Sequence, residues 1–91
     1  IMRYLLVTFL RKPGGRIDEQ AGFSNVIKQK DLSECNVILD YQEQKVVKCV
    51  IEGKVVPTSF ESMHEYYKKV YPNMITQMEH FQMDKLKDKF K

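Results

Sequence analysis

Cations and phenols are the side chains of this sequence that best suit a binding chemistry. Arg11, Lys12 and Arg16 flank a Pro-Gly-Gly run, which predicts an exposed loop with three positive charges. Tyr66 and Lys69 lie three residues apart, so they share one flank of a predicted helix. Guanidinium and ammonium groups neutralise phosphates, and a phenol ring can stack on a base. These five residues therefore predict a nucleic-acid-binding surface, although lysine beside tyrosine is also common at a helix boundary.

Residues for catalysis or metal binding do not gather in the sequence. His64 and His80 are sixteen residues apart, so they do not form the pair at i, i+4 that is typical of a zinc site, and we expect both at the surface. Gly14-Gly15 lacks the Lys-Ser/Thr ending of a phosphate loop. The carboxylates look like turn and surface charges rather than acids converging on a pocket. We expect no enzymatic activity, no metal and no cofactor.

Composition favours a cytoplasmic protein of modest charge. The two cysteines, Cys35 and Cys49, lie in apolar strand-like runs, where a thiol behaves as a small hydrophobic side chain. Two cysteines do not form a disulfide framework, so a reducing cytoplasm is the expected compartment. The net charge of +3 is far from that of a protein that coats nucleic acid, and solubility alone would explain it.

The residue pattern of the chain changes from strand-like to helix-like at Pro57. Before it, β-branched and aromatic runs are broken by Gly, Asn and Asp, whereas residues 58–91 hold no Gly and space their apolar positions at threes and fours. This predicts an α+β fold: an antiparallel sheet of three to four strands at about residues 2–56, then a C-terminal helical arm at about 59–90. A chain of 91 residues has room for one such domain.

The predicted strands begin with a nearly continuous apolar run at residues 3–11, which is typical of a central strand covered on both faces. Residues 17–27 could return as a second strand, with Gly22 at a bulge. The clearest hairpin follows, and residues 55–56 could extend the sheet briefly after a turn at residues 53–54. For that hairpin we predict a register that places Asp40 opposite Lys48, because charge pairing and face burial then agree.

The helical arm has a start signal and an interruption. Thr58 and Glu61 form a capping box, which predicts that the helix begins after Thr58. Pro72 is disfavoured inside a helix but favoured in a first turn, so the arm should kink or split there. One apolar stripe is expected to cover the sheet: Phe60, Met63, Tyr67, Val70, Met74, Met78 and Phe81.

Beyond Pro72 the arm carries more apolar residues than one helix face can bury on a small sheet. Burying a Leu or Phe fully is worth roughly 1.5–3 kcal/mol, which would favour pairing of two arms about a two-fold axis. We therefore predict a homodimer, with a frayed lysine-rich tail as the alternative. Its predicted interface consists of Met74, Met78, Phe81, Leu86 and Phe90.

Three segments resemble small accessory proteins of T-even-like bacteriophages: residues 2–15 (Met-Arg-Tyr-Leu-Leu-Val-Thr-Phe-Leu-Arg-Lys-Pro-Gly-Gly), residues 35–41 (Cys-Asn-Val-Ile-Leu-Asp-Tyr) and residues 66–72 (Tyr-Tyr-Lys-Lys-Val-Tyr-Pro). The resemblance covers most of residues 2–81. That group consists largely of host-takeover factors, which redirect host enzymes or antagonise toxin–antitoxin defences, in some cases through RNA. The resemblance implies a non-enzymatic binder in the cytoplasm of an infected bacterium. It carries over no site residue.

Two functions follow as expectations. The first is a protein that binds RNA through Arg11, Lys12, Arg16, Tyr66 and Lys69 to regulate or inhibit a host factor. The alternative is a protein–protein interaction module that occludes a host enzyme without nucleic acid. The methionines of the arm favour the alternative, because they offer an adaptable apolar surface.

Overall fold

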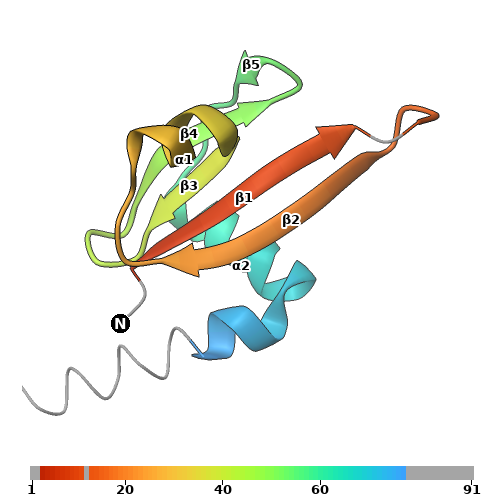
Figure 1. Ribbon diagram of the computed structural model, residues 1–91. Coiled ribbons are helices and arrows are strands. Elements are labelled where there is room, and N and C mark those ends of the chain that lie inside the picture. The colour runs from red at the N-terminus through yellow and green to blue at the C-terminus, as the bar shows by residue number, and fades with distance from the viewer. Residues whose placement is uncertain (1–2, 12, 78–91) are drawn as a thin grey trace, which may run out of the picture.

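The computed structural model describes residues 3–11 and 13–77. Within them, five antiparallel strands form one sheet in the order β2-β1-β3-β4-β5 (Figure 1). The predicted α+β class is confirmed, and the sheet exceeds three to four strands because a two-residue strand pairs with β4. The elements are β1 (Tyr4–Arg11), β2 (Ile17–Ser24), α1 (Gln29–Glu34), β3 (Val37–Asp40), β4 (Lys45–Ile51), β5 (Lys54–Val55) and α2 (Phe60–Val70).

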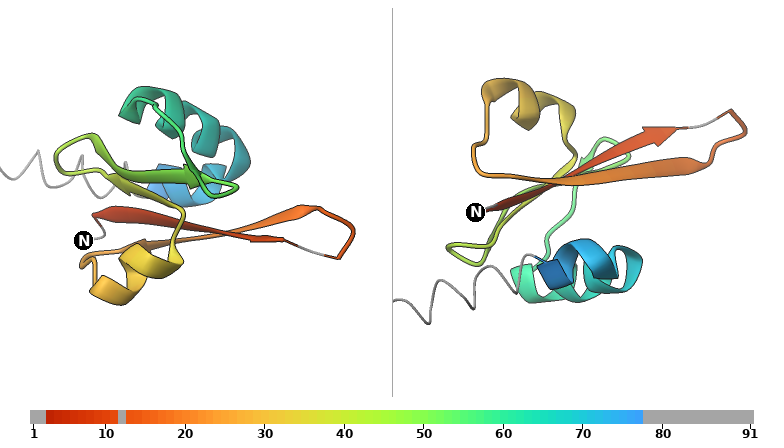
Figure 2. Two further views of the ribbon diagram at one scale, coloured as in Figure 1. Left: turned by 90° about the horizontal axis from the view of Figure 1, so that it is seen from above. Right: turned by 60° about the horizontal axis from the view of Figure 1, so that its bottom comes forward.

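The two helices cover opposite faces of the sheet (Figure 2). The α2 side holds the core, which consists of Leu5, Val7, Val37, Leu39, Tyr41, Cys49, Tyr67 and Ile75. All four residues of β3 are buried, including Ile38 on the α1 side. The strand covered on both faces is therefore β3 rather than the predicted residues 3–11. β1 buries Leu5 and Val7 but leaves Leu10 46% exposed, because α1 is too short to reach the far end of that strand.

Glycine permits two of the turns. Residues 13–15 lie in the β1–β2 connection, where Gly14 and Gly15 have φ values of 93° and 83°. The β4–β5 turn has φ values of 52° at Glu52 and 77° at Gly53. Positive φ at both central residues is the type I′ geometry that matches the twist of a two-residue hairpin.

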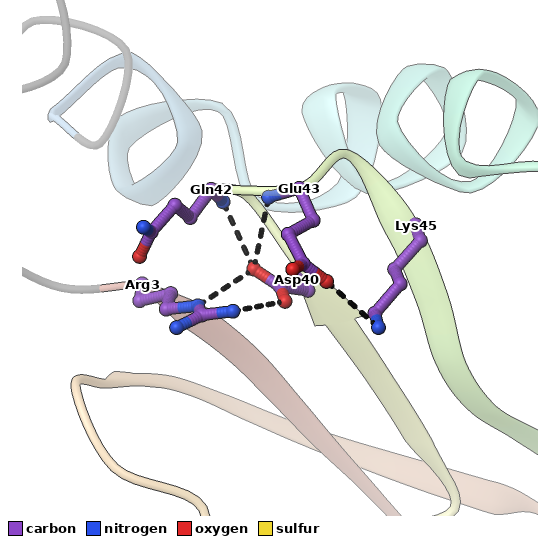
Figure 3. Close-up of polar contacts among 5 residues, drawn as sticks. All are labelled: Arg3, Asp40, Gln42, Glu43 and Lys45. Carbon is purple, nitrogen blue, oxygen red and sulfur yellow. Dashed lines mark hydrogen bonds and ion pairs between the residues drawn. The ribbon is translucent and has the colours of Figure 1, made fainter.

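The strand pairings correct two predictions. All eight residues of β2 pair with β1 in one continuous register, so the predicted bulge at Gly22 is wrong. The irregularity lies between Ile38 and Leu39, where the β3–β4 register shifts. Asp40 pairs with Lys45 rather than Lys48. The Asp40 side chain instead binds the guanidinium of Arg3, 37 residues earlier in the chain (Figure 3). The charge pairing with Lys48, on which the predicted register depended, is therefore absent.

The helical arm splits at the predicted place. Ser59 is the N-cap of α2, one residue later than predicted, because its side chain accepts a hydrogen bond from the Ser62 amide. α2 ends at Val70, Tyr71 has non-helical dihedrals (φ −128°, ψ 61°), and residues 72–77 are helical again. Pro72 thus occupies a first turn, as expected. After the break, Ile75 is the residue buried in the core, whereas the predicted Met74 is only half-buried. Val70, at the end of α2, was predicted to be in the stripe but is exposed.

Candidate functional site

The predicted cationic loop lies at the end of the β1–β2 hairpin (Figure 1). Arg11 is the last residue of β1 and pairs with Ile17, the first residue of β2. Arg11 and Arg16 both have exposed side chains, whereas Lys12 lies outside the described residues. A guanidinium nitrogen of Arg11 (Nη2) is 3.6 Å from Glu52 Oε1. One of the predicted phosphate-binding cations therefore already faces a carboxylate.

The predicted aromatic flank lies on α2, where Tyr66 and Lys69 are both exposed. The Tyr66 hydroxyl donates to Glu19 Oε1 over 3.5 Å. Glu19 pairs with Phe9 in the sheet, two residues before Arg11. The fold therefore brings this end of α2 against β2, close to the base of the hairpin that carries the two arginines.

Glu19 sits in an unusual environment for a carboxylate. One oxygen accepts from Tyr66, and the Glu19 backbone carbonyl accepts from the Tyr71 hydroxyl at 3.1 Å. The other oxygen, Oε2, is buried without a hydrogen-bond partner among the described residues. Burial raises the pKa of Glu19, and the Tyr66 hydrogen bond opposes that shift only in part. Burial also raises the pKa of Tyr66 and that of Tyr71. The cluster holds a proton more readily than an exposed carboxylate would.

A second site, not foreseen in the sequence, is an apolar cleft of about 320 Å³ between β1 and the β4–β5 turn. Its apolar residues come from the three strands β1, β2 and β4. The complete lining is Phe9, Leu10, Arg11, Ile17, Asn36, Ile51, Glu52 and Gly53. Leu10 and Ile17 are 46% and 42% exposed. Apolar side chains of this size on the rim of a hollow are a common mark of a binding surface.

Charge around the cleft is mostly positive. Arg11 and Glu52 face one another across it, and both side chains are more than half exposed. Arg16, which precedes β2, and Lys54, the first residue of β5, are also exposed. Asp18 pairs with the lining residue Leu10, so three cations stand against two carboxylates. This small positive excess favours an acidic partner at this end of the molecule.

His64 and the two cysteines are at least partly buried. His64 was expected at the surface, but it is half-buried: its Nδ1 lies 3.1 Å from the Tyr41 hydroxyl, and its ring stacks on Phe60. Cys35 and Cys49 are buried free thiols, and burial raises the pKa of Cys49. Across residues 3–11 and 13–77, His, Cys, Asp and Glu form no group of three or more that could hold a metal ion.

The predicted dimer interface falls mostly on residues that the structure does not describe. Met74 is half-buried on the helical segment at residues 72–77. Met78, Phe81, Leu86 and Phe90 lie outside the described residues, as does His80. The homodimer therefore stays a prediction.

Comparison of the chain with protein-family models, curated proteins and solved structures finds no match. In the part of the chain that the structure describes, no helix combines the length and the apolar character needed to cross a membrane.

Proposed function

We propose that this chain is a non-enzymatic protein-binding module that docks its partner at the apolar cleft. The observation that carries the proposal is the pair Leu10 and Ile17, two large apolar side chains left 46% and 42% exposed on the lining of a hollow. Fully burying such a side chain is worth roughly 1.5–3 kcal/mol, so a partner that covers both gains substantially.

The neighbouring strand extends the apolar surface. β5 pairs Lys54 with Ile51, a residue of the cleft, and adds Val55, which is 79% exposed. An apolar centre with cations at its margin matches the general anatomy of a protein interface. The resemblance to phage host-takeover proteins adds the expectation that the partner is a bacterial enzyme whose surface this module occludes.

RNA binding is the second candidate, and one observation favours it. The Tyr66–Glu19 contact brings the tyrosine and lysine end of α2 close to the base of the arginine hairpin, so the two predicted halves lie in one region. Two carboxylates weaken this candidate, because Glu52 lies beside Arg11 and Glu19 faces Tyr66. A polyanion would have to be bound next to both of them.

Capture from a bacterial lysate by the immobilised full chain, with and without nuclease, tests the two candidates. We expect a nuclease-resistant protein that is lost in Ile17→Asp, because a carboxylate would stand in the apolar cleft. Val26→Asp is the matched control, since Val26 is 60% exposed and lies outside the cleft. Far-ultraviolet circular dichroism confirms that both variants fold.

The alternative outcomes are distinct. Nuclease-sensitive capture that is lost in the triple variant Arg16→Ala/Tyr66→Ala/Lys69→Ala would establish RNA binding and reject the protein-binding module. Protein capture that survives Ile17→Asp would place the docking surface elsewhere and reject the cleft.

A further inference from the structure

The strands beside the cleft differ in length, and this leaves a vacant position in the sheet. β1 has eight residues and β4 has seven, whereas β3 between them has only four. β3 pairs with β1 only from Val37 to Asp40, opposite Val7 to Tyr4. On the N-terminal side of Asn36 the chain comes from α1, outside the sheet. Among the described residues, no strand therefore lies between Phe9–Arg11 and Ile51, at the ends of β1 and β4. Figure 1 shows these two strand ends apart. Because neighbouring strands in a sheet lie about 4.8 Å apart, a vacant strand position, here called the lane, is roughly 10 Å wide in regular geometry.

The backbone of β1 points its hydrogen-bonding groups into the lane. Within β1, the Val7 carbonyl accepts from the Asn36 amide at 3.0 Å, on the β3 side. Residues two apart along a strand turn their backbone groups to the same side. By the same alternation, Phe9 and Arg11 direct theirs into the lane, where the Asn36 side-chain amide reaches only the Phe9 carbonyl at 3.3 Å.

The sheet register fixes where the side chains of an added strand would lie. Leu5 pairs with Leu39 and Val7 with Val37, and Val37 in turn pairs with Cys49. An antiparallel strand that continues β3 would thus place one residue between Phe9 and Ile51, both of which pack against the core. That residue should be apolar. The residue two positions earlier would lie beside Arg11 and should be acidic.

We propose that the lane accepts an extended segment of a protein partner by β-strand addition, with the order acidic–x–apolar from its N-terminal to its C-terminal end. This inference rests on the proposed protein-binding function and adds the chemistry of the bound segment. Main-chain bonds to Phe9 and Arg11 supply part of the affinity, and the two side-chain positions supply the selectivity. The incoming acid displaces Glu52 from Arg11, an exchange that is feasible because that exposed pair is 3.6 Å apart.

Fluorescence polarisation with the full chain and labelled, acetylated heptapeptides is the test. One array carries a central acidic–x–apolar triplet with Glu or Asp before and Val, Ile or Leu after. The control array carries the same residues in the order apolar–x–acidic. We expect dissociation constants below about 1 mM for the first array and at least about tenfold weaker binding for the second. No binding by either array, or equal binding by both, would overturn strand addition.

A charge swap provides the matched variants. Arg11→Glu should weaken the acidic–x–apolar peptides about tenfold, and a Lys–x–apolar peptide should restore binding to that variant. Arg16→Glu makes the same charge change outside the lining and should have a much smaller effect. Failure of the Lys peptide to restore binding would overturn the contact with Arg11.

Two further results separate this inference from the proposals on which it rests. If no peptide binds but lysate capture still depends on Ile17, strand addition fails and the protein-binding cleft stands. The chain itself contains acidic–x–apolar triplets at residues 79–81, 84–86 and 88–90. Sedimentation of the full chain is therefore measured with and without the peptides. A dimer that dissociates when peptide is added would show that a second copy of the chain occupies the lane, and would overturn the proposal of a different protein as partner.

Discussion

The two ends of β1 meet the rest of the sheet in opposite ways. The end at Tyr4 is closed: Arg3 and Asp40 join β1 to β3 and to the turn that follows it (Figure 3). The end at Arg11 is open, with an apolar cleft between β1 and the β4–β5 turn. Both ends carry an arginine and a carboxylate, so the difference lies in burial and geometry rather than in residue type.

At the closed end both oxygens of the carboxylate accept hydrogen bonds. Arg3 donates through two nitrogens to the two Asp40 oxygens, at 2.9 and 2.7 Å. The amides of Gln42 and Glu43 also donate to Asp40 Oδ1, at 2.9 and 3.3 Å. The Asp40 side chain is 1% exposed. The Arg3 hydrogen bond holds the pKa of Asp40 below its usual value, although burial acts in the opposite direction.

At the open end the corresponding pair, Arg11 and Glu52, is 3.6 Å apart, with side chains 67% and 57% exposed. Such a pair contributes little to folding because water screens it and both side chains stay mobile. An arginine that stabilises the fold only weakly is free to bind something else. The proposed function therefore places stability and binding at opposite ends of the same strand.

The largest predicted effect is at the closed end. Asp40→Ala should lower the free energy of unfolding by about 3 kcal/mol, because it leaves Arg3 and two turn amides without their acceptor. Urea unfolding followed by circular dichroism measures the change. Glu43→Ala is the control: Glu43 forms an exposed ion pair with Lys45 in the same turn and should cost less than about 0.5 kcal/mol. Equal losses of unfolding free energy in the two variants would show that the buried Arg3–Asp40 pair stabilises the fold no more than the exposed Glu43–Lys45 pair.

The same carboxylate gives a pH dependence of known sign. Because the pKa of folded Asp40 lies below the usual 3.8, its contribution is complete above that value and is lost as pH falls through the folded pKa. The free energy of unfolding of Asp40→Asn should therefore fall less steeply with decreasing pH than that of the parent chain. An unchanged pH dependence would mean that other carboxylates dominate acid unfolding.

Asp40 also shows where reasoning from sequence fails. Local alternation identifies the β3–β4 hairpin, and the proline rule identifies the split at Pro72, because both depend on neighbours in the chain. The register of the hairpin depends on Arg3, which is 37 residues from Asp40, and no local pattern reveals that pairing. A local charge match with Lys48 was the available signal, and it pointed to the wrong register.

The residues proposed for binding divide in the same way. The exposed arginines and Tyr66 could be predicted from composition and helix spacing, and they are exposed as expected. The cleft could not be predicted, because it arises where a short β3 departs toward α1 between two longer strands. The excess length of the run at residues 3–11 was the only local signal. Its meaning depends on the strand order, which the sequence does not specify.

A smaller effect of opposite sign is predicted for Glu19, which lies toward the open end. Because burial raises its pKa above the usual 4.5 in the folded chain, the folded state binds a proton more tightly than the unfolded state. Stability attributable to this group is therefore present below pH 4.5 and is lost as pH rises through the folded pKa. Glu19→Gln keeps an oxygen for Tyr66 and removes the charge, so it should stabilise the chain at pH 7 by up to about 1 kcal/mol.

Urea unfolding at pH 4 and pH 7 checks this sign. The gain from Glu19→Gln should be present at pH 7 and largely absent at pH 4, where the parent carboxyl is protonated. Glu65→Gln, an exposed position on α2, is the matched control and should show no such difference. A loss of stability at pH 7 in Glu19→Gln would mean that the charged form is favoured and that the buried oxygen has acquired a partner.

The smallest effect on stability, and the sharpest test of the comparison, is expected at the open end. Glu52→Gln removes the carboxylate beside Arg11 and should change the free energy of unfolding by less than about 0.5 kcal/mol, since the pair is exposed. It should at the same time tighten binding of acidic–x–apolar peptides several-fold, because the incoming acid no longer competes with Glu52 for the guanidinium. Glu43→Gln, which alters the exposed pair at the closed end, should leave peptide affinity unchanged. If Glu52→Gln instead destabilised the chain as strongly as Asp40→Ala, the open end would be a structural clamp like the closed one. Urea unfolding and polarisation on the same preparations distinguish these outcomes.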